Sequence, residues 1–319
     1  MKIVVLDGFA VNPGDLSWDF FNKYGELTVY DKTQSELTAE RCADAVAVFT
    51  NRAEISKELL DKCLRIHYIS ALGTGYDMID LAECKKRGIE VCNVPGYSSA
   101  SVSQFTFALL LNLVTDINGF TKIVKDGLWT GIPGFHYETT RFMELSGMTL
   151  GLIGCGAIGK RVAEMANTFG MKVIATTSSK TSGNENGITY LSLNELLGRS
   201  DVVSLHCPLN EKTRGMVDKS FISKMKDGAF LINTARGAIL NESDVAEALN
   251  SDKLCGVALD VLANEPAMAD NPLLNAKNCI ITPHAAWTSI AARKRLLTIL
   301  EANLESFTKT GKGINSLIK

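Results

Sequence analysis

Short apolar runs alternate with helical patterns from the start of this chain. Runs rich in β-branched residues predict strands at residues 3–6, 27–30, 45–49 and 66–70, with helices between them. Alternation of this kind requires crossover connections and therefore a parallel sheet. The pattern predicts a first α/β domain over residues 1–97, which ends in a loop where Pro95 and Gly96 interrupt regular structure.

A long helix is predicted from Ser98, because apolar residues recur there at helical spacing and form a stripe typical of buried helices. The stripe consists of Val102, Phe105, Leu109, Leu113 and Ile117. Gly131, Pro133 and Gly134 then indicate a loop or arm near residues 129–135.

A second strand and helix series follows this arm. Strands are expected at residues 149–153, 172–176, 202–205, 229–233, 256–259 and 279–282. The last helix carries one apolar face from Ile290 to Phe307, by way of Leu297, Leu300 and Leu304. Together the two series predict an α/β protein with two parallel-sheet domains.

Composition narrows the range of partners. The 319 residues are 46% hydrophobic and 21% charged, with a formal net charge of −2, which is typical of a globular protein. Without a basic excess there is no electrostatic reason to expect nucleic acid or an anionic membrane. No apolar stretch is long enough to cross a bilayer. Eight cysteines without a C-x-x-C pair argue against disulfides and zinc and favour a cytoplasmic location.

A glycine-rich turn follows the strand expected at residues 149–153 and opens a helix. Its residues are Gly154, Cys155, Gly156, Ala157, Ile158 and Gly159. In this context the glycines allow a tight turn and close backbone approach, and the helix N-terminus attracts a pyrophosphate. The turn predicts a dinucleotide site, although an ordinary glycine-rich connection has the same spacing.

The residues after the next strand bear on the choice of dinucleotide. An NAD site usually carries an acid there to bind the ribose hydroxyls, whereas this chain has Thr177, Ser178, Ser179 and Lys180. Losing the acid removes a repulsive contact with a 2'-phosphate, and Lys180 could neutralise that phosphate. The sequence favours NADP without excluding NAD.

Polar residues with catalytic chemistry follow later strands. Arg236 follows residues 229–233, Asp260 follows residues 256–259, and His284 follows residues 279–282. Ligands of open α/β sheets bind beyond the carboxyl ends of the strands, so these side chains should meet near Gly154. An arginine fork can hold a carboxylate, and an imidazole can exchange a proton with a substrate oxygen. Glu265, before a proline, would stabilise the charged imidazole, unless it is only a solvated loop acid.

At these residues the chain resembles the D-isomer-specific 2-hydroxyacid dehydrogenases, over nearly its whole length. Besides the turn, the matching segments are residues 71–77, 93–97, 206–209, 233–237, 259–261, 265–266 and 283–284. The segments at 6–8 and 12–18, with Trp287, look most like the glycerate dehydrogenase or hydroxypyruvate reductase branch.

The resemblance implies a Rossmann dinucleotide domain over residues 98–285 and a flavodoxin-like substrate domain over 1–97 and 286–319. It implies that Arg236, Glu265 and His284 are catalytic and that amides around Leu72, Gly73 and Thr74 hold the substrate carboxylate. Cys207, Pro208 and Thr234 would line the cofactor, and Asp260 would contact its nicotinamide carboxamide. Residues 98–147 resemble a dimerisation arm, which implies a homodimer.

The sequence therefore predicts an enzyme that reduces hydroxypyruvate or glyoxylate to the D-2-hydroxy acid, or the reverse. A D-lactate or other D-2-hydroxyacid dehydrogenase is the alternative, and a dinucleotide-sensing corepressor is a rival of another class. Formate dehydrogenases carry Gln where Glu265 stands, and 3-phosphoglycerate dehydrogenases often add a C-terminal domain, which argues against both.

Overall fold

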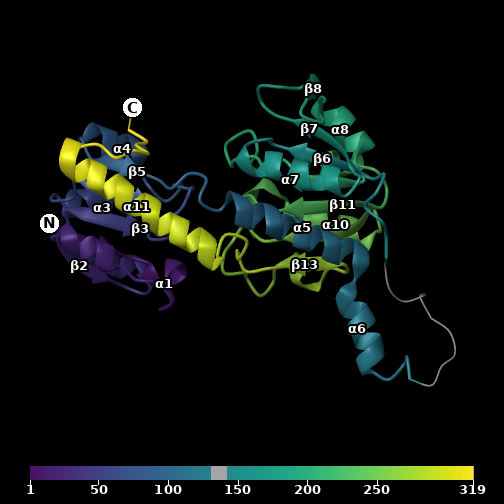
Figure 1. Ribbon diagram of the computed structural model, residues 1–319, viewed down its shortest axis with the longest axis horizontal. Helices are drawn as coiled ribbons and strands as arrows, with labels where there is room; N and C mark the ends of the chain where they lie inside the picture. Colours follow the sequence, from purple (N-terminus) through teal and green to yellow (C-terminus); the bar gives the residue numbers. More distant parts are fainter. Residues whose placement is uncertain (131–141, 319) are drawn as a thin grey trace. The chain divides into compact units, whose positions relative to one another are not determined.

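The computed structural model describes residues 1–130 and 142–318, so most of the expected loop at 129–135 lies outside the described residues. The chain divides into two compact units (Figure 1): Met1–Ser98 with Trp287–Lys319, and Ser99–Ala286. These bounds lie one residue from the expected ones. Each unit is built on a largely parallel sheet, so the predicted fold class is confirmed.

The first unit has a five-stranded parallel sheet in the order β2-β1-β3-β4-β5, in which β1 lies between β2 and β3. Its strands are β1 (Lys2–Val5), β2 (Glu26–Val29), β3 (Ala47–Thr50), β4 (Tyr68–Ala71) and β5 (Glu90–Cys92). Its helices are α1 (Gly8–Val11), α2 (Thr38–Cys42), α3 (Lys57–Lys62), α4 (Leu81–Lys86) and α11 (Ile290–Thr310), with 3-10 turns η1 (Asp19–Lys23) and η2 (Ser35–Leu37). The sequence pattern did not predict β5, because this strand is only three residues long and begins with the charged Glu90.

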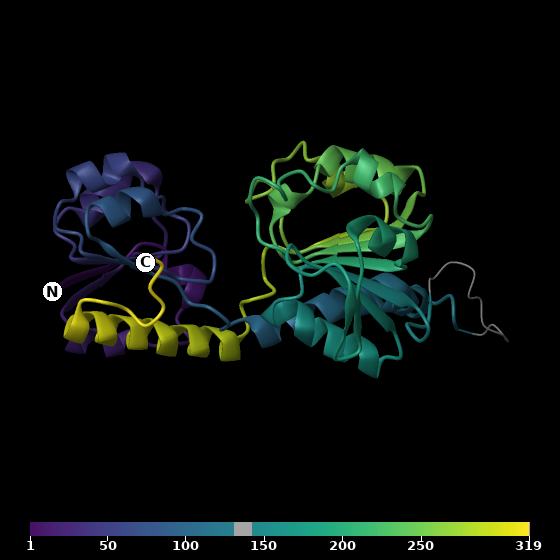
Figure 2. The ribbon, with the colours of Figure 1, turned by 90° about the horizontal axis from the view of Figure 1, so that it is seen from above.

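Helix α11 packs along one face of this sheet (Figure 2), where Leu296, Leu300 and Leu304 are fully buried. Side chains of α2, α3 and α4 form the core on the other face. Ile290 is exposed, contrary to the predicted stripe, because it is the first residue of the helix. Near that end Arg293 is buried and binds Asp15 through two bonds of 2.6 Å, which fixes the loop at 12–18.

The second unit has an eight-stranded sheet in the order β13-β12-β11-β10-β6-β7-β9-β8, parallel except for the hairpin β8–β9. Its strands are β6 (Thr149–Ile153), β7 (Lys172–Thr176), β8 (Gly183–Glu185), β9 (Ile188–Tyr190), β10 (Val202–Leu205), β11 (Ala229–Asn233), β12 (Leu254–Leu259) and β13 (Cys279–Ile281). Helices α5 (Ser99–Thr115) and α7 (Ala157–Thr168) contribute to the core on one face. Helices α8 (Leu193–Arg199), α9 (Lys219–Ser223) and α10 (Glu242–Asn250) contribute on the other, and η3 (Gly237–Ile239) and η4 (Pro272–Asn275) are 3-10 turns.

The long helix predicted from Ser98 is broken at Asp116, which has a left-handed backbone with φ of 42°. Beyond it α6 (Ile117–Lys125) begins, with the Asp116 carboxylate capping the Gly119 N–H at 3.0 Å. The buried stripe therefore ends at α5, and Ile117 is exposed. No single helix of the described residues is long and apolar enough to span a membrane, and only the bent pair α5 and α6, taken together, passes that test.

Candidate active site

The three residues expected to carry the chemistry lie beyond the carboxyl ends of neighbouring strands in the second unit. Arg236 follows β11, Glu265 lies in the segment after β12, and His284 follows β13. Because β11, β12 and β13 are adjacent and parallel, the segments that follow them leave the same edge of the sheet.

The structure brings His284 and Glu265 into direct contact. The His284 Nδ1 lies 2.8 Å from the Glu265 Oε2, and the side chains are 30% and 25% exposed. The other carboxylate oxygen accepts the Leu262 N–H at 3.2 Å, so the loop backbone holds Glu265 in place. Nε2 is therefore the ring nitrogen left to serve a substrate.

His284 has a left-handed backbone, with φ of 55°. This conformation is uncommon for a residue with a side chain, and such strain tends to occur at functional sites. The backbone is held because the His284 N–H donates to the Asp260 carbonyl at 2.8 Å and to the Thr282 carbonyl at 2.9 Å.

The Arg236 segment is shaped by its neighbours. The buried Asn233 side chain accepts the Ala235 N–H at 2.9 Å and donates to the Arg236 carbonyl at 2.8 Å. At Gly237 a Cβ atom would lie 1.9 Å from the carbonyl carbon of Leu262, so only glycine lets this segment meet the one that carries Glu265. The sequence indicated Arg236 but assigned no role to Asn233 or Gly237.

The Asp260 side chain is buried and forms hydrogen bonds with neighbouring residues of the same unit. Its carboxylate is buried and accepts the Thr282 hydroxyl at 2.6 Å and the N–H groups of Ala285 and Ala286 at 2.8 and 2.9 Å. Burial raises the pKa of Asp260, against the lowering effect of these bonds. Asp260 thus fixes the segment on both sides of His284, and the contact with the nicotinamide carboxamide that the resemblance implies stays a prediction.

The glycine-rich turn has the geometry that a dinucleotide requires. Gly154 has φ of 93°, and a Cβ there would lie 2.5 Å from the His206 carbonyl. A Cβ at Gly159 would meet the Gly154 carbonyl at 2.6 Å, whereas nothing lies within 4 Å of one at Gly156. Gly156 is the N-cap of α7 and has no side chain to cap it, so the first amides of this helix suit an anion. The turn, with Ala157 and Ile158 opening the helix, fits a pyrophosphate.

Thr177 is the first residue after β7, as predicted, and β7 is tied to the glycine turn because the Gly154 N–H donates to the Thr176 carbonyl at 2.9 Å. The Thr177 hydroxyl accepts the N–H groups of Ser179 and Lys180 at 3.3 and 2.9 Å. The segment 177–180 is therefore a compact turn beside the glycine turn, with Ser178 in its middle.

Residues expected along the cofactor lie at the ends of β10 and β11. Cys207 is half-buried, and burial raises the pKa of its thiol, whereas Pro208 is exposed. The Thr234 hydroxyl lies 3.1 Å from that of the buried Thr106 in α5. Their positions at the ends of β10 and β11 suit the expected role beside a cofactor.

In the first unit, Leu72, Gly73 and Thr74 follow β4. The Leu72 N–H donates to the Thr50 carbonyl at 2.7 Å, so this amide already belongs to the sheet and does not suit the expected contact with a substrate. The Thr74 hydroxyl donates to the Val94 carbonyl at 2.8 Å, which holds the loop in shape. Gly73 and Thr74 remain candidates for holding a carboxylate.

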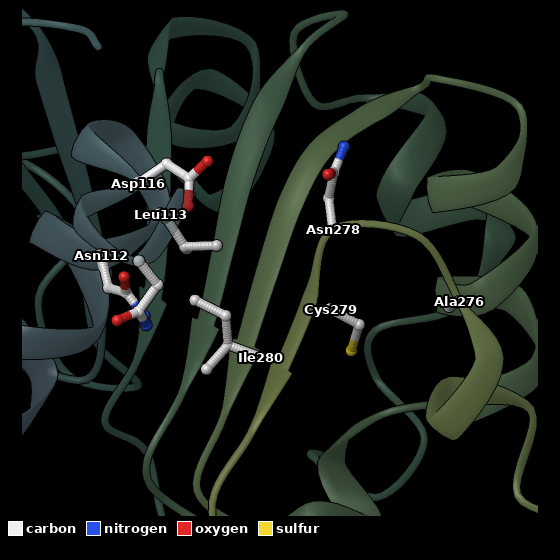
Figure 3. A pocket seen from close by; sticks show the side chains of 8 residues that line it. Asn112, Leu113, Asp116, Ala276, Asn278, Cys279 and Ile280 are labelled. Atoms are coloured by element: carbon white, nitrogen blue, oxygen red, sulfur yellow. The ribbon is translucent and has the colours of Figure 1, made fainter. Parts of the chain in front are cut away.

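A hollow of about 390 Å³ lies elsewhere in the second unit. Figure 3 shows that its lining includes Asn112 and Asp116 from the α5 side and Asn278 and Cys279 at the start of β13. His284 follows the other end of β13, so this hollow is not part of the site around the imidazole. Among residues 1–130 and 142–318, no group of three His, Cys, Asp or Glu side chains could hold a metal ion.

Comparison with known proteins gives consistent matches. The family model described as D-isomer specific 2-hydroxyacid dehydrogenase, NAD binding domain, matches residues 107–286. The chain is 43% identical over 323 residues to a hydroxypyruvate reductase of Blautia hydrogenotrophica, with 100% of both chains covered. It is also similar to an acyclic imino acid reductase in complex with NADPH and D-Arg, with 33% identity, a TM-score of 0.88, and 99% and 100% of the two chains covered. A D-lactate dehydrogenase from Aquifex aeolicus complexed with NAD and lactic acid gives 31% identity, a TM-score of 0.86, and coverage of 100% and 99%.

Proposed function

We propose that this chain, which belongs to the D-isomer-specific 2-hydroxyacid dehydrogenase family, reduces hydroxypyruvate or glyoxylate to the D-2-hydroxy acid. The observation that supports this most is the bond between His284 Nδ1 and Glu265 Oε2 at 2.8 Å, beside the Arg236 segment. The 43% identity to a hydroxypyruvate reductase supports this substrate class over lactate.

The roles of the residues follow from their chemistry. When bound, the dihydronicotinamide supplies a hydride to the carbonyl carbon of the keto acid. The protonated His284 gives its proton to the carbonyl oxygen, so that the product is a neutral hydroxyl, and in the oxidation His284 takes that proton back. Glu265 orients the ring and stabilises its charged form. Arg236 holds the substrate carboxylate and stabilises charge that develops on the adjacent oxygen.

The other expected contacts are part of the same proposal. The amides of Gly73 and Thr74 assist with the substrate carboxylate, and Cys207, Pro208 and Thr234 line the cofactor. Asp260 positions the segment that carries His284 and, as the resemblance implies, contacts the nicotinamide carboxamide. We also propose a cytoplasmic homodimer, in which exposed apolar side chains of α6 and the adjacent residues meet a second copy of this chain.

A steady-state panel tests the reaction. Hydroxypyruvate, glyoxylate and pyruvate are each supplied with NADPH and with NADH, and the D-configuration of the product is checked by chiral chromatography. We expect hydroxypyruvate or glyoxylate to give the highest kcat/KM. A higher value for pyruvate would favour the D-lactate alternative, and no turnover of any keto acid would favour a binding protein.

The cofactor proposal is that NADPH serves at least as well as NADH, because Thr177 stands where an acid would repel a 2'-phosphate. Thr177→Asp should shift the ratio of kcat/KM values toward NADH by about tenfold. An aspartate can still accept the N–H groups of Ser179 and Lys180, so the turn should keep its shape. A native enzyme that strongly prefers NADH, with a ratio unchanged in the variant, would contradict this role of Thr177.

A further inference from the structure

Lys180 has partners that the sequence did not suggest. Its Nζ lies 2.5 Å from the Glu185 Oε2 and 4.2 Å from the centre of the Tyr190 ring. Glu185 ends β8 and Tyr190 ends β9, so both belong to the hairpin at the edge of the second sheet. The one cation of the 177–180 turn is thus already bound to an acid of the same unit.

This ion pair lies beside the place where a 2'-phosphate would bind. Thr177 and Lys180 close one turn, because the Thr177 N–H donates to the Lys180 carbonyl at 3.1 Å. The same turn follows β7, whose last carbonyl receives the Gly154 N–H. A phosphate that approaches Thr177 therefore meets Lys180, and with it the Glu185 carboxylate.

The Lys180–Glu185 ion pair can open easily, so Lys180 can exchange Glu185 for another anionic partner. The two side chains are 36% and 49% exposed, and an ion pair exposed to that degree contributes little to stability, so its opening is easy. The hydrogen bond from Lys180 lowers the pKa of Glu185, and the nearby Lys160 adds to this, so Glu185 is charged at neutral pH. The Tyr190 ring gives the ammonium a second partner through a cation–π contact, which does not depend on Glu185. The Tyr190 hydroxyl also donates to the Cys155 Sγ at 3.6 Å, which joins the ring to the glycine-rich turn.

We propose that Glu185 and the 2'-phosphate of NADPH compete for Lys180, and that Glu185 is a specificity-determining residue that limits the preference for NADPH. With NADH the ion pair stays closed, whereas with NADPH Lys180 turns from Glu185 to the phosphate. Glu185 then remains as a nearby negative charge that opposes the phosphate. This inference rests on the proposed dinucleotide site and refines its cofactor choice.

The test measures binding of two small probes to the full chain by calorimetry: adenosine 2',5'-bisphosphate and 5'-AMP, which differ only in the 2'-phosphate. Glu185→Gln should strengthen binding of the bisphosphate about threefold to tenfold, because the phosphate no longer competes with a charge. Lys180→Met should weaken it by about tenfold. Binding of 5'-AMP should stay within about a factor of two of the native value, because neither substituted side chain touches this probe.

A double variant and a matched control complete the design. In Lys180→Met, the added Glu185→Gln change should give a smaller gain than in the native chain, because the competition for Lys180 is absent and only the repulsion between Glu185 and the phosphate is removed. Glu247→Gln breaks the exposed Lys219–Glu247 pair at 2.7 Å, elsewhere in the same unit, and should change neither probe.

Two results would overturn the proposal, and they have different meanings. If Lys180→Met weakens the bisphosphate but Glu185→Gln has no effect, Lys180 binds the phosphate without competition. If the native chain binds 5'-AMP but gains nothing from the 2'-phosphate, and neither variant changes this, the NADPH preference is also wrong. Turnover of hydroxypyruvate with NADH, measured on each variant, separates both results from failure of the dehydrogenase assignment.

Discussion

Single residues at this site divide into those that we propose carry the chemistry and those that hold them in place. Strand ends and residue types pointed to Arg236 and His284, because an open parallel sheet has one edge for ligands. The sequence could not indicate that Asn233 holds the Arg236 segment, or that the Asp260 carboxylate accepts two amides beside His284. Such contacts join residues that only the folded chain brings together.

Replacement of His284 tests the proton donor. His284→Asn should lower kcat by about a hundredfold or more, because the amide cannot donate a proton to the forming alkoxide. Asparagine tolerates the left-handed backbone observed here, so the loop should survive. Stopped-flow and steady-state reduction of hydroxypyruvate measure the effect. Glu265→Gln, which keeps the imidazole, is the control and should lower kcat less than His284→Asn does. Near-native turnover in His284→Asn would remove the assignment.

The titration of His206 makes the stability of the folded chain depend on pH. Burial lowers the pKa of His206 from 6.5 to about 4, while its Nε2 lies 2.9 Å from the Ser204 hydroxyl. Below pH 6.5 His206 binds a proton in the unfolded chain, whereas in the folded chain it stays neutral until the pH falls to about 4. The free energy of unfolding should therefore fall as the pH drops through this window.

Urea unfolding at pH 7 and pH 5 measures that loss. It should be smaller by about 1–2 kcal/mol in His206→Gln than in the native chain, since glutamine does not titrate. An equal loss in the two proteins would show that His206 is protonated in the folded state as readily as in the unfolded chain.

At the scale of elements, the second unit followed its sequence closely. The bounds of β6, β7, β10 and β11 agree with the prediction, because these central strands are buried on both faces and read as unbroken apolar runs. The hairpin β8–β9 was missed because β8 is polar and exposed. A usable signal was present in Asn186-Gly187, whose φ angles of 50° and 75° are those of a tight hairpin turn.

Packing between segments gives a prediction at Gly237. Gly237→Ala should destabilise the chain by about 1–3 kcal/mol and lower activity, because the added Cβ would displace Leu262 and the Glu265 loop. Thermal unfolding and kcat/KM measure both effects. Gly198→Ala in α8 is the matched control: its nearest atom would be 4.0 Å away, and it should be neutral or stabilising by up to about 1 kcal/mol. Equal behaviour of the two variants would contradict the steric argument.

On the scale of the whole molecule, helix α6 and the residues next to it, called the arm from here on, expose apolar side chains that suit the proposed dimer interface. Ile117, Val124, Leu128, Trp129 and Phe142 are each at least half exposed, and large exposed apolar side chains often mark interaction sites. Helix α6 begins where Asp116 ends the buried helix α5, so the arm starts at the border of the second unit's core.

The homodimer proposal can be tested on this arm. Leu128→Lys with Trp129→Lys should convert a dimer, of twice 34.6 kDa, into a monomer, because charges would be buried at the interface. Light scattering after size exclusion measures the mass. Leu64→Lys, at an exposed leucine of the first unit, is the control and should leave the dimer intact. A native monomer would refute the proposal.

The edge position of the hairpin β8–β9 has a consequence for protein engineering. A strand pair at the margin of a sheet touches one neighbour only, here β7. Residues 181–187 can therefore be randomised in a library with little risk to the central strands, while the imidazole and its carboxylate stay unaltered. Selection on such a library would search for new coenzyme usage in a part of the chain that is separate from the proposed proton donor and its carboxylate partner.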